Sequence, residues 1–422
     1  MPTLKKEQEQ AINHDSGNII VSASAGSGKT FVMIERAIRL ICENKTHVKE
    51  ILAVTFTEAA ASEMKEKLKK ALTDRVINGE KKFASEIADI GTADICTLHS
   101  FCGRLIRSYF FVAGIAPDFK VIDETEMAEF KKDAIDKTFK EFYQGKEDWF
   151  LSLVDKYKCN RRDDEFKNII LSLYDFANAE KDPDSLISAS INLYTKENYL
   201  RIKTQYKDML IRELIPIKND IVYAMHNLKV LDIKQGVEFA DRLYDDITVI
   251  ERIDIFRLKE FEGYKPKYSF PKKIDEEVLR LKNLLVSSRD KMGDIINRYC
   301  ASLGEEETEE SLEKLRTHSE NLFKVLNKFR ENYSNLKASE NVLDFDDLEH
   351  NAIKVLSDEN IRAEVQKKYK YVFVDEYQDV NGVQEDIVSK VSNNNLFMVG
   401  DVKQSIYGFR GCNPNIFLNK IM

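Results

Sequence analysis

The sequence lacks the features that mark secreted, membrane and metal-centred proteins. Its six cysteines are scattered along 422 residues without a CxxC pair, which argues against a disulfide framework or a cysteine-based zinc or cluster site. No apolar run approaches the roughly 18 residues that span a bilayer, and residues 1–10 are too polar for a signal peptide. These absences predict a cytoplasmic protein.

An excess of positive charge is also missing. Lys and Arg total 64 against 72 Asp and Glu, which leaves a net charge of −8 at pH 7. The charge gives no support for a nucleic-acid partner, so any DNA contact must use local groups and not a broad basic field. The 43% hydrophobic content is that of a globular protein, and 422 residues suffice for two or three domains.

The stretch from Ile19 to Thr30 predicts a strand, a loop of small residues and the start of a helix. Such a loop wraps a phosphate chain in backbone N–H groups at the positive end of the helix. Lys29 can then reach the terminal phosphates, and the Thr30 hydroxyl can ligate magnesium. The flanking strand and helix disfavour the alternative, a turn that binds nothing. The predicted nucleotide-binding residues here are Ala23, Ser24, Ala25, Gly26, Ser27, Gly28, Lys29 and Thr30.

Short apolar runs alternate with helical patterns at both ends of the chain. The predicted further strands are residues 51–56, 95–98, 371–374 and 396–399. This alternation predicts an α/β fold in which a parallel sheet carries helices on both faces, with ligands at the carboxyl ends of the strands. Thr55, Thr57 and His99 stand at such ends. Gln8, on a polar helix before the first strand, could pair with adenine.

Two adjacent acids, Asp375 and Glu376, follow the strand at 371–374. Beside a phosphate loop, the first can hold magnesium and the second can accept a proton from the attacking water. A solvated acidic turn is the alternative. After the strand at 396–399, Gln404 could touch the terminal phosphate, while Tyr407 and Phe409 face a second ligand or pack in the core.

The middle of the chain has a different composition and a different hydrophobic pattern. Only five of the 16 glycines fall between residues 115 and 340, where long amphipathic patterns replace the strands. We therefore expect a separate helical domain at 116–340, inserted between two parts of the first domain, 1–115 and 341–422. Pro216 predicts a break or kink in one of its helices.

Together these motifs resemble those of the UvrD-type superfamily 1 helicases, in order and in spacing. The resemblance covers residues 4–115 and 340–418. Within that family, the AddA branch is the most similar; its members are the helicase/nuclease subunits of bacterial AddAB complexes. The motifs that carry the resemblance are Gln8, 23–30, 55–57 with 59–64, 97–101, 375–379 and 400–410.

The resemblance implies a RecA-like P-loop NTPase domain that uses ATP and Mg²⁺, with an accessory helical insertion. It implies 3′ to 5′ translocation on single-stranded DNA in double-strand break repair, duplex-end DNA as substrate and an AddB-like partner subunit. By the same resemblance, Gln8 reads adenine, and the catalytic residues are Lys29, Asp375, Glu376 and Gln404. The implied DNA-binding residues are Thr55, Phe56, Thr57, His99, Tyr407, Phe409 and Arg410.

Two departures from the family pattern stand out. Glu58 occupies a position where many relatives carry Asn, and a carboxylate is unfavourable near a phosphate backbone. Only 12 residues follow Arg410, so we expect a fragment without the second RecA-like domain or the nuclease, and with little ATP hydrolysis of its own. A UvrD/Rep-type repair helicase without a nuclease, and a non-motor module that binds DNA or a partner, remain the alternatives.

Overall fold

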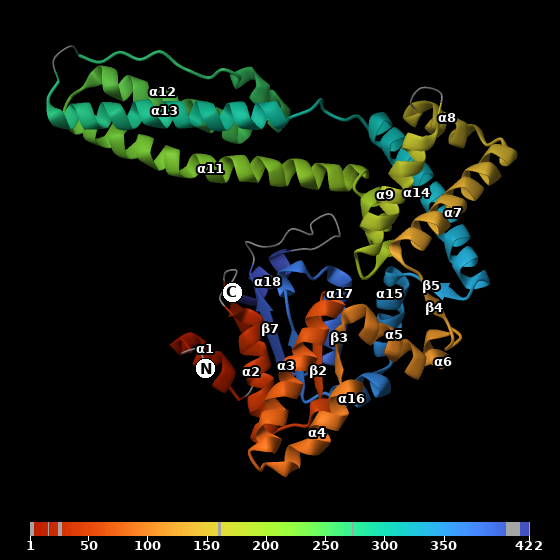
Figure 1. Ribbon diagram of the computed structural model, residues 1–422. Coiled ribbons are helices and arrows are strands. Elements are labelled where there is room, and N and C mark those ends of the chain that lie inside the picture. Colours follow the sequence, from red (N-terminus) through yellow and green to blue (C-terminus); the bar gives the residue numbers. More distant parts are fainter. Residues whose placement is uncertain are drawn as a thin grey trace. The chain divides into compact units, whose positions relative to one another are not determined.

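A parallel sheet of five strands, in the order β1-β7-β6-β2-β3, is the centre of the first part of the molecule (Figure 1). The computed structural model describes residues 4–15, 17–23, 28–158, 162–271, 274–401 and 414–421. The strands are β1 (Ile19–Ser22), β2 (Ile51–Thr55), β3 (Asp94–Thr97), β6 (Tyr371–Val374) and β7 (Leu396–Gly400). Each neighbouring pair is parallel, which confirms the predicted parallel sheet and brings all five carboxyl ends to one edge.

Alternate residues of the central strands pack on opposite faces of the sheet, as the period of a strand requires. Ile51 and Ala53 of β2 join the core beneath α2 (Lys29–Cys42) and α3 (Glu58–Ile77). Leu52 and Val54 join the core beneath α5 (Leu98–Ser108), α15 (Phe345–Leu356) and α17 (Gly382–Val391). Because both faces are covered, these strands are continuous apolar runs.

The described residues form two compact units, Met1–Ser188 with Asn321–Met422, and Ala189–Glu320. The other helices that lie wholly or partly in the first unit are α1 (Lys6–Asn13), α4 (Ala84–Asp89), α6 (Phe110–Ala113), α7 (Glu124–Gly145), α8 (Asp148–Tyr157), α9 (Asp164–Asn178), α10 (Pro183–Asn192), α14 (Glu309–Ser339), α16 (Glu359–Lys368) and α18 (Pro414–Ile421). The chain is thus mostly helical and contains a five-stranded parallel sheet. None of the helices in the described ranges has the length and apolarity to cross a bilayer.

A second, two-stranded parallel sheet joins two segments that are far apart in sequence. β4 (Lys120–Val121) pairs with β5 (Val342–Leu343). The N–H of Lys120 donates to the Asn341 carbonyl at 3.1 Å, and the N–H of Ile122 donates to the Leu343 carbonyl at 3.0 Å. The chain therefore departs and returns at neighbouring points, on either side of its long helical middle.

A buried acidic turn begins α15. Asp344 caps the helix and accepts hydrogen bonds from Tyr333 Oη and Lys337 Nζ, both at 2.7 Å and both from α14. Lys337 also lies 2.6 Å from Asp347. Burial acts to raise the pKa of Asp344, but Lys337 lowers it overall. Burial together with the charge of Asp344 raises the pKa of Asp346 to about 7 and that of Asp347 to about 6. The single positive charge of Lys337 thus cannot neutralise the carboxylates of Asp344, Asp346 and Asp347.

The second unit is built on three helices, α11 (Lys196–Val230), α12 (Lys234–Arg252) and α13 (Glu276–Ser302), which share one apolar core. The predicted break at Pro216 does not occur, because α11 runs through it without interruption. A proline inside a helix costs about 3 kcal/mol. The buried side chains Leu210, Leu214, Ile217 and Ile221 on either side offset this cost by packing in the core.

Candidate active site

The two described ends of the predicted phosphate loop, Ala23 after β1 and Gly28 before α2, lie at the carboxyl edge of the five-stranded sheet. Residues 24–27 lie outside the described residues. Gly28, the N-cap of α2, has a φ of +82°, a left-handed conformation that favours glycine. A Cβ there would stand 3.3 Å from Gln8 Nε2 of α1. The Ala23 N–H donates to the carbonyl of Gly400, the last residue of β7, at 3.2 Å. Gln8 thus lies beside one end of the loop, and Gly400 holds the other.

The first two residues of α2 face the two acids that follow β6. Thr30 Oγ1 donates to Asp375 Oδ2 at 3.1 Å, although 345 positions separate the two residues. Lys29 Nζ lies 3.7 Å from Glu376 Oε2. The ammonium is buried and makes no hydrogen bond to the part of the chain that the structure describes. A buried ammonium without hydrogen-bond acceptors is costly, and an anionic ligand would remove that cost.

Asp375 is a buried carboxylate with too little positive charge around it. Its side chain is 4% exposed, and burial, followed by the neighbouring charge of Glu376, raises its pKa. The hydrogen bonds from Thr30 and from the Glu376 N–H, and the charge of Lys29, act in the opposite direction without reversing the shift. A cation bound at this carboxylate would supply the missing charge.

Glu376 is held in an unusual backbone conformation, with a φ of +48°. Such a conformation costs a non-glycine residue about 1–3 kcal/mol and persists only where its surroundings enforce it. Gln378 is one such neighbour, since its Nε2 donates to Glu376 Oε2 at 2.8 Å while its Oε1 accepts the Asp401 N–H at 2.8 Å. The Gln378 amide thus ties Glu376 to the end of β7.

Sequence reasoning assigned no role to Gln378. The available signal was its place in the Asp375–Asp379 motif, two residues after Glu376. Nothing in the spacing of the motif shows that β7 would be the neighbour of β6. A Cβ on Gly400 would lie 2.7 Å from Gln378 Oε1 and 3.1 Å from Phe417 Cζ, so a larger residue there would displace the Gln378 amide from its contacts.

The DNA-contact predictions that fall in the described residues lie at the ends of β2 and β3. Thr55 is buried, and its Oγ1 donates to the Thr57 carbonyl at 3.0 Å. Thr57 caps α3 by accepting the Ala60 N–H at 3.2 Å. Phe56, between them, is 40% exposed and can present its ring to solvent.

His99 is tied to neighbours on α15. Its Nε2 is 3.0 Å from Glu349 Oε1, and its ring packs on Phe345 with 4.6 Å between centroids. His99 does not cap its helix, because Thr97 is the N-cap of α5. The remaining predicted residues, Gln404, Tyr407, Phe409 and Arg410, lie outside the described residues.

Comparison with known proteins shows the family to which the chain belongs. Residues 4–421 match the family of the UvrD/REP helicase N-terminal domain. Curated relatives that are named as ATP-dependent helicase/nuclease subunits include those of Alkaliphilus metalliredigens (32% identical over 100% of this chain and 36% of the relative) and Pediococcus pentosaceus (33% identical over 98% and 36%). The chain thus spans about a third of the length of these relatives. The match over nearly all of its residues shows that this chain belongs to the UvrD/REP helicase N-terminal domain family.

Proposed function

We propose that this chain is the ATP- and DNA-binding N-terminal part of an AddA-type ATP-dependent DNA helicase/nuclease that acts in double-strand break repair and recombination. The observation that carries the proposal is the meeting of Lys29 and Thr30 with Asp375 and Glu376 across the sheet's carboxyl edge. A phosphate loop and an acid pair have a joint use in phosphoryl transfer.

The residues present fit ATP with Mg²⁺. Lys29 offers a buried ammonium that lacks a hydrogen-bond acceptor among the described residues, and Asp375 offers a buried carboxylate whose pKa is raised. Thr30 and Asp375 would hold the metal, which would neutralise phosphate charge when bound. No group of three or more acidic, histidine or cysteine side chains suited to a metal occurs among the described residues. Phosphate oxygens and water would complete the shell, as is usual for Mg²⁺.

The chain's own groups then have distinct roles. Lys29 Nζ binds the terminal phosphates, and Glu376 Oε2, oriented by Gln378, accepts a proton from the attacking water. Gln8 reads the adenine; its position beside Gly28 supports this role. From the family resemblance, we also assign Gln404 to the terminal phosphate.

We further propose that residues 1–115 and 341–422 form one RecA-like motor domain, interrupted by a helical accessory insertion at 116–340. All five strands of the central sheet come from the two outer segments. The pairing of β4 with β5 supports this arrangement, because it brings the start and the end of the insertion together. Within the proposed insertion, residues 189–320 form a compact unit of their own.

Single-stranded DNA would cross the carboxyl ends of β2 and β3, at Thr55, Phe56, Thr57 and His99, and continue to Tyr407, Phe409 and Arg410. The exposed ring of Phe56 supports this path, since base–aromatic stacking contributes about 1–3 kcal/mol per base without any sequence preference. Such stacking lets an acidic protein bind DNA. The relatives are named as subunits, which supports an AddB-like partner for the full-length protein.

ATP binding by this chain tests the proposal. A fluorescent ATP analogue with Mg²⁺ should bind the unaltered chain and the control Lys70→Ala, which changes an exposed lysine of α3. It should show no measurable binding to Lys29→Ala at the same concentrations. Equal affinity of all three would place the nucleotide elsewhere and overturn the proposal. ATP hydrolysis with and without single-stranded DNA then separates a motor from a non-motor binding module.

A further inference from the structure

One residue on the proposed DNA path has no role in the function described so far. Glu58 is the first residue of α3 and follows directly after Thr57. The residue is exposed, and Thr57 before it belongs to the proposed DNA path. A negative charge at this position opposes the binding of DNA. The contacts of the Glu58 carboxylate suggest its role.

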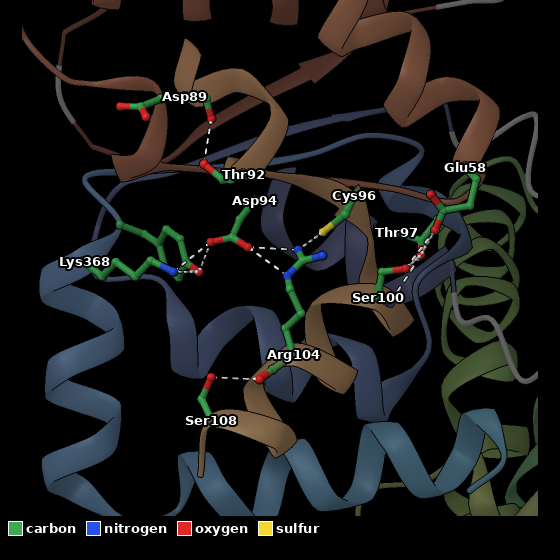
Figure 2. A network of polar contacts seen from close by, with 11 residues as sticks. Glu58, Asp89, Thr92, Asp94, Cys96, Thr97, Ser100, Arg104, Ser108 and Lys368 are labelled. Atoms are coloured by element: carbon green, nitrogen blue, oxygen red, sulfur yellow. Dashed lines mark hydrogen bonds and ion pairs between the residues drawn. The ribbon is translucent and has the colours of Figure 1, made fainter. Parts of the chain in front are cut away.

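The Glu58 carboxylate is bound by two hydroxyl groups from the neighbouring strand end (Figure 2). Its Oε1 accepts hydrogen bonds from Thr97 Oγ1 at 2.9 Å and from Ser100 Oγ at 2.8 Å. Thr97 Oγ1 also lies 3.0 Å from Ser100 Oγ, so its single proton can go to Glu58 or to Ser100, whereas Ser100 donates to Glu58. A carboxylate oxygen with two hydroxyl donors reproduces the contacts of a bound phosphate oxygen.

The two hydroxyls stand at the positive end of α5. Thr97 is the N-cap of that helix, and Ser100 lies in its first turn. Glu58 itself is in the first turn of α3. The hydrogen bonds from Ser100 and Thr97 lower the pKa of Glu58, with smaller contributions from the charges of Lys65 and Arg104. The carboxylate is therefore fully ionised at neutral pH.

We propose that Glu58 acts as an intramolecular competitor of the DNA backbone: its carboxylate occupies the hydroxyl donors of Thr97 and Ser100 that a phosphate of single-stranded DNA would otherwise use. This inference rests on the proposed function and deepens it, because it names a residue that sets the affinity of the DNA path. Each hydroxyl has one proton, so a hydroxyl that donates to Glu58 presents only lone pairs to a phosphate.

The competition should make DNA binding weaker at this one point of the path. A phosphate reaches the two hydroxyls only if Glu58 swings away, and while Glu58 stays in place its charge repels the backbone. A DNA-binding protein that has to release each nucleotide in turn benefits from such a weak contact. The Glu58→Gln variant keeps the shape of the side chain, removes its charge and weakens its hold on the hydroxyls.

The test is the affinity for a fluorescent oligothymidylate, measured by anisotropy over a range of salt concentrations. Glu58→Gln should bind at least about fivefold more tightly than the unaltered chain at low salt. The log–log slope of affinity against salt should stay nearly unchanged, because a neutral hydroxyl that contacts a phosphate releases no counterion. The control is Glu63→Gln, which removes the same charge from the same helix; Glu63 pairs with Lys67 instead. It should change affinity less than twofold and leave the slope unchanged.

A double variant assigns the gain to the hydroxyls. Adding Ser100→Ala to Glu58→Gln should abolish most of the increase, since it removes a donor that Glu58 had released. The inference is overturned if Glu58→Gln binds DNA no better than Glu63→Gln, or if it merely lowers the melting temperature, as a purely structural clamp between α3 and α5 would.

A readout without DNA separates this inference from the proposed function. If the unaltered chain and all variants fail to bind DNA, the proposed DNA path is wrong. Inorganic phosphate then probes the hydroxyls alone: Glu58→Ala should gain a phosphate-dependent rise in melting temperature that the unaltered chain and Glu63→Ala lack. A folded Glu58→Ala without that rise would refute the competition itself.

Discussion

Two buried aspartates lie at opposite ends of the same sheet and differ in the charge around them. Asp94 begins β3, at the amino edge, and is 7% exposed, whereas Asp375 follows β6, at the carboxyl edge, and is 4% exposed. Burial acts to raise the pKa of both. Lys368, Tyr369 and Arg104 lower the pKa of Asp94 overall, while Asp375 keeps a raised pKa beside Glu376.

The contacts of Asp94 explain the difference (Figure 2). Its Oδ1 accepts from Arg104 Nε at 3.0 Å, and its Oδ2 accepts from Lys368 Nζ at 2.8 Å and Tyr369 Oη at 2.6 Å. Asp375 has the Thr30 hydroxyl, one backbone N–H and a second carboxylate for neighbours. A carboxylate surrounded by matching donors stabilises the fold. One without them indicates a site that a ligand completes.

The largest loss of stability is expected where a mutation removes the cation that pairs with a buried group of acidic side chains. Lys337→Met leaves Asp344 and Asp347 without their ammonium partner, so the free energy of unfolding should fall by about 3–5 kcal/mol. Urea unfolding measures the loss. Lys328→Met, on the same helix but paired at the surface with Glu331, should cost less than about 1 kcal/mol. Similar losses in both variants would show that buried charge is not what matters.

At the carboxyl edge, Lys29→Ala should abolish stabilisation by nucleotide and leave the fold intact. At an ATP concentration 100-fold above Kd, binding to the folded state alone contributes about 2.7 kcal/mol, which appears as a rise in melting temperature. The Lys29 variant should show no rise with ATP and Mg²⁺, whereas Lys70→Ala should match the unaltered chain. A persisting shift would mean that the binding site lies away from the sheet edge.

At the amino edge, Asp94→Asn should have the opposite signature. The variant removes the charge that Arg104, Lys368 and Tyr369 share, so stability should fall by about 2 kcal/mol, moderated because both cations are about half exposed. Its stabilisation by ATP should be unchanged. Asp89→Asn, which breaks a surface pair with Lys49, is the control and should cost under about 0.5 kcal/mol. Loss of nucleotide binding in Asp94→Asn would contradict the division between the two edges.

The smallest effect concerns Asp346, which shares the raised pKa of Asp375 without lying in the proposed site. With a pKa of about 7 in the folded state and one near 4 when unfolded, Asp346 retains its proton longer in the folded chain. Stability is therefore lost as the pH rises through the window between about 4 and 7.

Asp346→Asn should remove that dependence. Since the side chain keeps some contact with solvent, the gain should be about 1 kcal/mol at pH 8 and vanish near pH 4. Melting temperatures of the variant and the unaltered chain across this range measure it. Asp74→Asn, exposed on α3, should show no such trend. A gain of equal size at both pH values would refute the role of ionisation.

Much of the architecture could be predicted from local patterns. The strand at residues 371–374 coincides with β6, and the helix whose start was predicted at the end of the phosphate loop is α2, which begins at Lys29. Buried parallel strands are short apolar runs, and long helices carry regular apolar seams, so both can be seen in the sequence. The prediction of a break at Pro216 was wrong, because the packing of buried side chains on both sides of the proline keeps α11 continuous.

Side-chain periodicity and chemical type are local properties, and they were enough to indicate which segments become strands and helices and which residues could bind phosphate. The order of the strands is visible only in the structure. It decides the contacts of Thr30 with Asp375, of Gln378 with Asp401, and of Glu58 with Thr97 and Ser100. Contacts between segments that are distant in the chain depend on how the whole sheet assembles. No local pattern of residues encodes them.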